Sequence, residues 1–120
     1  MKKEVFEEYR KNLNSVEEIN FQKVSKNTTH SNWMFGIRFP NFSLQDKRDL
    51  ELSLFEFDID SRPMFYDINK HQFLSNIKNN STNSEILQRQ CLILPSYPEL
   101  TKGQIIYVCE KIKKFIINKK

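Results

Sequence analysis

The chain has no alanine and only two glycines, Gly36 and Gly103, among its 120 residues. Two isolated glycines cannot build a glycine-rich phosphate loop, so a Walker loop and a dinucleotide fingerprint are excluded. No apolar run approaches the roughly 20 residues that a membrane-spanning helix needs, and residues 1–10 lack the apolar stretch of a secretory signal. We therefore expect a cytoplasmic protein with no membrane partner. The missing alanine indicates biased coding and carries no functional information.

Residues that bind metals or act as nucleophiles are also few. Cys91 and Cys109 form no CxxC pair, both lie in apolar stretches, and the histidines are only His30 and His71. A metal site needs three or four such ligands, and a hydrolytic triad built on Ser61 or Cys91 has no motif to support it. We predict buried, reduced cysteines and no metal site.

Positive charge exceeds negative charge, with 19 Lys and Arg against 15 Asp and Glu and a net charge of +4. Much of the excess lies in residues 111–120. A basic tail can bind nucleic acid, or it can be a solvated helix end that suits the helix dipole. The tail lysines are not interleaved with exposed aromatics as in strand-binding grooves, so we favour the solvated helix and predict no nucleic-acid partner.

The length suits one domain, residues 1–120. Apolar residues at helical spacing predict helices, and alternation predicts strands. Ser43 with Asp46, and Thr101 with Gln104, have the spacing of capping boxes at helix starts. In chain order the predicted elements are helix 3–13, strand 19–24, strand 33–39, helix 43–57, extended segment 59–66, a loop with a short helical turn over 70–83, a short helix capped by Ser84, a buried strand or helix end at 92–94, and a last helix capped by Thr101. This order predicts an α+β fold, a small mixed or antiparallel sheet covered by helices.

The strand at 33–39 has the clearest alternation. Trp33, Phe35, Ile37 and Phe39 share one face, and Met34, Gly36 and Arg38 share the other. Leu50, Leu54 and Phe57 are the residues that helix 43–57 should bury.

Residues 59–66 carry the best candidate for chemistry. Arg62 and Tyr66 are an even number of residues apart, so an extended chain would project both to the same side. A guanidinium beside a phenol suits a phosphate or carboxylate. An arginine that stacks on an aromatic neighbour is the structural alternative. Pro63 argues against a central, fully paired strand here.

Three segments resemble the DegT/StrS family of pyridoxal-phosphate-dependent nucleotide-sugar aminotransferases. They are Ser-Asn-Trp-Met-Phe-Gly-Ile-Arg-Phe at 31–39, Ile-Asp-Ser-Arg-Pro-Met-Phe-Tyr at 59–66 and Leu-Pro-Ser-Tyr-Pro-Glu-Leu-Thr at 94–101. The resemblance implies the carboxy-terminal small domain of a fold-type I enzyme that moves an amino group to a nucleotide-linked keto-sugar. It also implies that a large domain, absent from this chain, holds pyridoxal phosphate and its lysine. The chain alone would then bind no cofactor and have no catalytic residue.

The resemblance places Arg62 and Tyr66 on the substrate side of the active-site cleft, with His71 and Asn32 as weaker candidates. Asp67 stands where the family often has proline, and a carboxylate there opposes an anionic nucleotide-sugar. Asp58 replaces a glycine, which implies strain if that position needs a positive φ.

Three functions remain open from the sequence. The first is a fragment or remnant of an aminotransferase without catalysis of its own. The second is a subunit of a split enzyme, completed by a separate large-domain chain. The third is an independent module that binds a protein or an anionic ligand, and an exposed apolar patch would favour the second. The expected partners are a large-domain chain or a second copy in a homo-oligomer.

Overall fold

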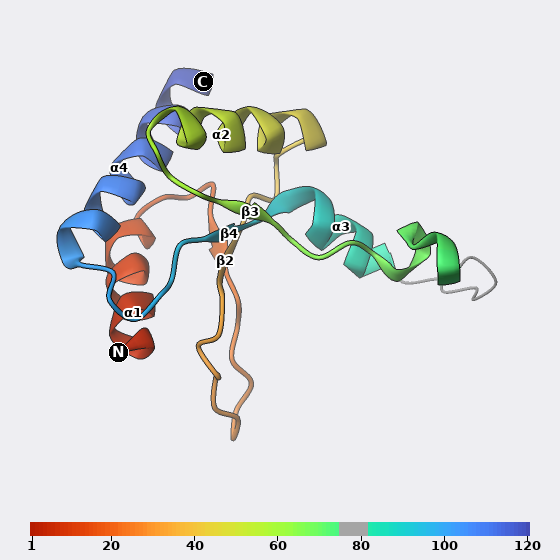
Figure 1. Ribbon diagram of the computed structural model, residues 1–120, viewed down its shortest axis with the longest axis horizontal. Coiled ribbons are helices and arrows are strands. Elements are labelled where there is room, and N and C mark those ends of the chain that lie inside the picture. Colours follow the sequence, from red (N-terminus) through yellow and green to blue (C-terminus); the bar gives the residue numbers. More distant parts are fainter. Residues whose placement is uncertain (75–81) are drawn as a thin grey trace.

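A computed structural model describes residues 1–74 and 82–120 of the chain (Figure 1). The order of helices and strands is the one expected from the sequence, and two short 3₁₀ turns lie at the start of the segment where a helical turn was expected. In chain order the elements are α1 (Lys2–Leu13), β1 (Asn20–Phe21), β2 (Phe35–Arg38), α2 (Leu44–Glu56), β3 (Arg62–Pro63), the 3₁₀ turns η1 (Ile68–Lys70) and η2 (Gln72–Leu74), α3 (Thr82–Gln90), β4 (Cys91–Leu94) and α4 (Lys102–Lys119).

The strands form one antiparallel sheet in the order β1-β2-β4-β3. In the centre of the sheet, Phe35 lies opposite Leu94 and Ile37 opposite Leu92. Figure 1 shows α1 and α4 side by side against the sheet, with α2 crossing near the end of α4. This is the α+β architecture that the sequence predicts, and its sheet is wholly antiparallel.

The core lies between the sheet and the helices. Phe35, Ile37 and Phe39 are buried from β2 and its end, and α4 buries apolar residues at helical spacing against them. Tyr9 of α1 stacks on Phe35 with ring centroids 4.8 Å apart. Both cysteines are buried and free, as predicted. The buried residues of α4 are Ile105, Val108, Cys109, Ile112 and Ile116.

Both predicted capping boxes are present. The amide of Asp46 donates to Ser43 Oγ at 3.1 Å, and the amide of Ser43 donates to the Asp46 carboxylate at 2.7 Å. Thr101 and Gln104 exchange the same pair of hydrogen bonds at 3.2 and 2.9 Å. Each reciprocal pair satisfies donors that a helix start leaves free, which is why these two helices begin where the sequence indicates.

The strands are shorter than the alternation predicts. Trp33 was expected within the strand, but it precedes β2 and is exposed. Asn32 has a φ of 54°, a left-handed conformation that breaks the extended chain just before Trp33. The first strand likewise covers only Asn20–Phe21 rather than residues 19–24.

Two helix predictions also need correction. Phe57 follows the last turn of α2 and is only partly buried. The ammonium of Lys111 lies over its ring, 4.1 Å from the ring centroid. The short helix begins at Thr82, so Ser84 lies inside its first turn rather than capping it. The predicted loop over 70–83 begins in η1 and η2, and its residues 75–81 lie outside the described part.

No helix within residues 1–74 and 82–120 is both long and apolar enough to cross a bilayer. The same two ranges contain no cluster of three or more His, Cys, Asp or Glu side chains that could hold a metal ion.

Candidate functional site

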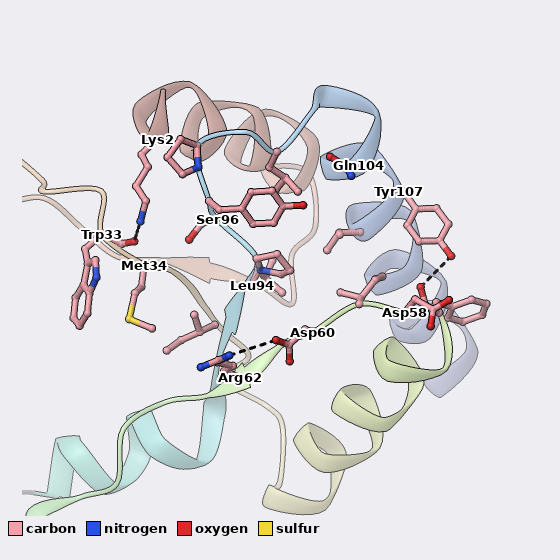
Figure 2. Close-up of a pocket in the computed structure, with 18 residues that line it drawn as sticks. Lys2, Trp33, Met34, Asp58, Asp60, Arg62, Leu94, Ser96, Gln104 and Tyr107 are labelled. Atoms are coloured by element: carbon pink, nitrogen blue, oxygen red, sulfur yellow. Dashed lines mark hydrogen bonds and ion pairs between the residues drawn. The ribbon is translucent and has the colours of Figure 1, made fainter.

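A cleft of about 870 Å³ lies beside the end of the sheet (Figure 2). Three segments far apart in the sequence line it: the turn at 58–62, the segment 93–98 that includes the end of β4, and the start of α4. Lys2, Trp33 and Met34 complete one side of the cleft. The second and third resemblance segments therefore meet in one place.

The wall formed by residues 95–98 is fixed by the core behind it. The hydroxyl of Tyr9 donates to the carbonyl of Pro95 at 2.7 Å, and the amide of Phe35 donates to Ser96 Oγ at 3.4 Å. Tyr9 is fully buried, and this burial raises the pKa of its phenol well above the ordinary value. The phenol therefore stays a neutral donor and holds Pro95 against α1 and β2.

The opposite wall is a tight turn after α2. Asp58 has a φ of 58°, and its amide donates to the Phe55 carbonyl at 3.0 Å. The positive φ expected for a position that replaces glycine is therefore present, and aspartate adopts it at lower cost than most residues. Tyr107 of α4 donates to the Phe57 carbonyl at 3.3 Å and closes this corner of the cleft.

The cleft contains groups of both charges. The guanidinium of Arg62 lies 3.5 Å from the carboxylate of Asp60, and both side chains are largely exposed. The ammonium of Lys2 donates to the carbonyl of Trp33 across the other side (Figure 2). Because an exposed ion pair is weak, Arg62 can exchange Asp60 for an oxygen of an anionic ligand. These charged groups could bind and orient an anionic ligand, and the described lining of the cleft contains no histidine.

The four predicted site residues do not all share this cleft. Arg62 lines it. Tyr66 and His71 lie further along the chain, with their rings in edge contact at 6.3 Å between centroids. Asn32 precedes β2, and its backbone N–H donates to the Nδ1 of His30 at 2.8 Å. None of the contacts described for residues 1–74 and 82–120 joins Arg62 to Tyr66. The paired strand covers Arg62–Pro63 and does not extend to Tyr66.

Sequence reasoning missed several residues of the cleft: Lys2, Trp33, Met34, Ser96, Gln104 and Tyr107. Ser96 lies in a segment recognised by resemblance, and Trp33 and Met34 lie in another, so those motifs were the available signal. Lys2, Gln104 and Tyr107 reach the cleft through the packing of α1 and α4 against the sheet, which local spacing does not encode.

The fold is that of a domain found in pyridoxal-phosphate aminotransferases. TlmJ, an aminotransferase from Streptoalloteichus hindustanus, superposes with a TM-score of 0.85 at 13% identity, covering 98% of this chain and 31% of that one. PseC of Helicobacter pylori, an aminotransferase of pseudoaminic acid biosynthesis, gives 0.85 at 13% identity over 98% of this chain and 32% of its own.

Sequence comparison identifies the family. The model of the DegT/DnrJ/EryC1/StrS aminotransferase family matches residues 1–113, so the chain belongs to that family. GDP-perosamine synthase of Escherichia coli O157:H7 is 31% identical over 118 residues, which are 98% of this chain and 31% of the synthase. The chain thus spans about a third of the length of the relatives it matches, and its match with them accords with the small domain implied by resemblance.

The described residues do not fit pyridoxal phosphate as a resident cofactor. The cofactor needs an unengaged lysine, an acid for its ring nitrogen and a phosphate cradle. Lys2, the lysine of the cleft, is bonded to Trp33. Lys47 is buried, and burial lowers its pKa, but its ammonium donates to the Gln88 carbonyl at 2.7 Å outside the cleft. Thr101 Oγ1 caps the start of α4, where a phosphate would otherwise bind.

Proposed function

We propose that this chain is the small-domain part of a pyridoxal-phosphate-dependent sugar aminotransferase and is not catalytic by itself. The observation that carries the proposal is the family match over residues 1–113 within a chain that spans 31% of GDP-perosamine synthase. A cytoplasmic location is part of the same proposal. The lysine, ring-nitrogen acid and phosphate cradle would come from a large-domain part.

The proposed substrate is a keto-sugar linked to a nucleotide. The name of GDP-perosamine synthase and the description of the Streptococcus pneumoniae protein Spr1654 as a putative sugar aminotransferase support this class. Spr1654, named as a PMP-form, matches with a TM-score of 0.83 at 16% identity, over 98% of this chain and 30% of its own. The cofactor that would supply amino-group transfer is therefore pyridoxal phosphate, held outside this chain.

Arg62 is the residue we propose for the anionic part of that substrate. Its guanidinium is exposed in the cleft, and its ion pair among the described residues is the weak one with Asp60, so a diphosphate could replace the carboxylate with charge-assisted hydrogen bonds. Tyr66, His71 and Asn32 would shape the pocket from neighbouring loops. The buried carboxyl residue Asp67 accepts from the amide of Asn69 at 3.5 Å, which turns this acid toward its own loop.

A split enzyme is the second candidate, in which a separate chain supplies the large domain. The exposed aromatic side chains beside the cleft favour it over an independent binding module, because such surfaces mark interaction sites. A homo-oligomer is the further partner proposed for the assembled enzyme.

Reduction with borohydride tests the proposal, because it fixes pyridoxal phosphate onto the lysine that binds it. The purified chain is mixed with pyridoxal phosphate, reduced and examined by intact mass and peptide mass spectrometry. We expect no stoichiometric pyridoxyl-lysine on this chain. The same reduction, applied to the protein isolated from its native source, should place the label on a bound large-domain chain or on large-domain residues continuous with this one.

A single stoichiometric pyridoxyl-lysine on the purified chain, together with transfer of an amino group from glutamate to a nucleotide keto-sugar, would contradict the proposal. A chain that is isolated alone and unlabelled from its source would contradict the split enzyme and leave a non-catalytic fragment or a binding module.

A further inference from the structure

His30 lies near the end of the long loop that joins β1 to β2 and projects from the sheet (Figure 1). It is half-buried, whereas loop residues 22–29 are exposed. Its ring meets that of Phe6 in α1, with centroids 5.5 Å apart and planes 59° apart. The imidazole is therefore held against the body of the domain while the rest of the loop lies in solvent.

Both ring nitrogens of His30 are engaged. The backbone N–H of Asn32 donates to Nδ1 at 2.8 Å, and Nε2 lies 2.9 Å from Oε1 of Gln22. Because an amide oxygen can only accept and Nδ1 already accepts, the proton of the neutral ring belongs on Nε2. In this tautomer the ring joins the two ends of the loop, one at Gln22 and the other at Asn32.

The hydrogen bond to Asn32 acts on the rim of the cleft. Asn32 has a φ of 54°, a conformation that is uncommon outside glycine, and its Nδ2 also donates to the carbonyl of His30 at 3.3 Å. The next residue, Trp33, lines the cleft, and Lys2 donates to its carbonyl there (Figure 2). The turn at Asn32 therefore sets the direction in which the chain enters the rim at Trp33.

Protonation of the His30 ring would remove this support. An imidazolium has two N–H donors and no acceptor, so Nδ1 could no longer accept from the Asn32 N–H, and two donors would face each other. Histidine is the side chain whose charge ordinarily changes between about pH 5 and 8. The hydrogen bond belongs to the neutral ring, so it is present at the upper end of this range and lost as the pH falls.

The charges around the loop do not compensate for an imidazolium. The side chains of α1 that reach the loop are cations: Arg10 and Lys2 each donate to a loop carbonyl, Arg10 at 3.2 Å. The loop itself adds the cations Lys23 and Lys26. Within the part of the chain that the structure describes, no ion pair joins His30 to a carboxylate. A protonated ring would therefore add to positive charge that is already there.

We infer that His30 is a pH-sensitive positioning residue of the cleft: its neutral ring holds the turn at Asn32 and so fixes Trp33 at the rim, and protonation releases both. In acid the cleft keeps Arg62 but loses its ordered rim at Trp33. The inference goes beyond the proposed function, because it depends on the geometry of this chain and holds for any ligand of the cleft.

Tryptophan fluorescence tests the inference, because Trp33 is the one tryptophan of the chain. Emission of the purified chain is recorded from about pH 8 to 5, and circular dichroism checks that each protein stays folded. His30→Asn keeps an acceptor near the position of Nδ1 and cannot titrate. His30→Phe keeps a ring against Phe6 and offers no acceptor. His71→Asn is the matched control, since it removes the other histidine and leaves His30 in place.

We expect the wild type and His71→Asn to show one emission transition in this pH range and both His30 variants to lose it. His30→Asn should emit at every pH as the wild type does at about pH 8, and His30→Phe as the wild type does at about pH 5. A wild type without the transition, or a transition that survives in the His30 variants, would overturn the inference. Identical emission from the two His30 variants would also overturn it, because the ring would then act on Trp33 without the hydrogen bond to Asn32.

Nitrogen-15 NMR of the wild type decides the same question without a variant. At about pH 8 the ring of His30 should carry its proton on Nε2, and the amide signal of Asn32 should shift as the ring is protonated. A neutral ring with its proton on Nδ1, or an Asn32 amide that does not follow the titration, would overturn the inference. Neither measurement involves a cofactor or a substrate, so failure here would leave the proposed function standing.

Discussion

The ammonium of Lys119, the second-last residue of the chain, lies 3.0 Å from the carboxylate of Asp46 at the start of α2. Asp46 also accepts from the amide and hydroxyl of Ser43, at 2.7 and 2.9 Å. These hydrogen bonds, the backbone one foremost, lower the pKa of Asp46. One carboxylate thus caps α2 and ties the end of α4 to it.

The lowered pKa of Asp46 predicts a loss of stability in acid. A group whose pKa is lower in the folded than in the unfolded protein contributes stability above its unfolded pKa, and this contribution is lost as pH falls through the folded pKa. Urea unfolding should therefore show a free energy that declines below about pH 4, the ordinary range for aspartate. Asp46→Asn should be less stable at neutral pH and show a smaller decline. An identical acid profile in both proteins would contradict this role, and Lys119→Ala should change stability by less than about 1 kcal/mol because the pair is partly exposed.

The hydrogen bond between Tyr9 and Pro95 predicts a second effect. Tyr9→Phe keeps the ring stacked on Phe35 but leaves the Pro95 carbonyl without its donor, so we expect the free energy of unfolding to fall by about 1–2 kcal/mol. Tyr107→Phe is the matched control, since it removes an exposed hydrogen bond of 3.3 Å to the Phe57 carbonyl. Urea denaturation should show a clearly larger loss for Tyr9→Phe. Equal losses would mean that burial of the hydroxyl does not matter.

Local sequence patterns predicted the helices, the strands and much of the core, because helix starts and strand alternation depend on residues that are neighbours in the sequence. The capping boxes at Ser43 and Thr101 set two helix starts, and the stripe of α4 was legible at helical spacing. The edge position of β3 followed from Pro63, whose nitrogen cannot donate to a ladder. Trp33 was placed in the strand by alternation alone, which cannot report that the paired residues of β2 begin only at Phe35.

The cleft was predictable only in part. The chemistry of residues 59–66 and the family resemblance both drew attention to Arg62, and Arg62 lines the cleft. The positions of Lys2 and Tyr107 depend on how two helices pack against a sheet, which alternation and helical spacing cannot report. The side to which Tyr66 projects was also not predictable. It was inferred from an extended chain over residues 59–66, whereas the paired strand covers two residues, Arg62–Pro63.

The thiols provide a third prediction. Burial raises the pKa of Cys109 from 9.0 to about 12 and raises that of Cys91 in the same direction. Because the thiolate is the reactive form, Ellman's reagent at neutral pH should label neither cysteine in the folded protein and both after unfolding. A pKa raised by folding contributes stability below the unfolded pKa and loses it as pH rises toward the folded value. Stability should therefore fall between about pH 9 and 12, and rapid labelling of folded Cys109 would contradict its burial.

The left-handed turn at Asp58 gives the last prediction. Its φ of 58° is accessible to glycine without steric cost, tolerable for aspartate and strained for a β-branched residue. Asp58→Val should lower the free energy of unfolding by about 1–2 kcal/mol, while Asp58→Gly should equal or slightly exceed the wild type, since relief of the strain offsets the greater freedom of the unfolded chain. Asp60→Val is the control, because Asp60 is exposed beside it without a positive φ. Thermal and urea unfolding of the three variants measure the difference. If valine is tolerated equally at both positions, the turn is not strained, and the replacement of glycine by Asp58 has no structural cost.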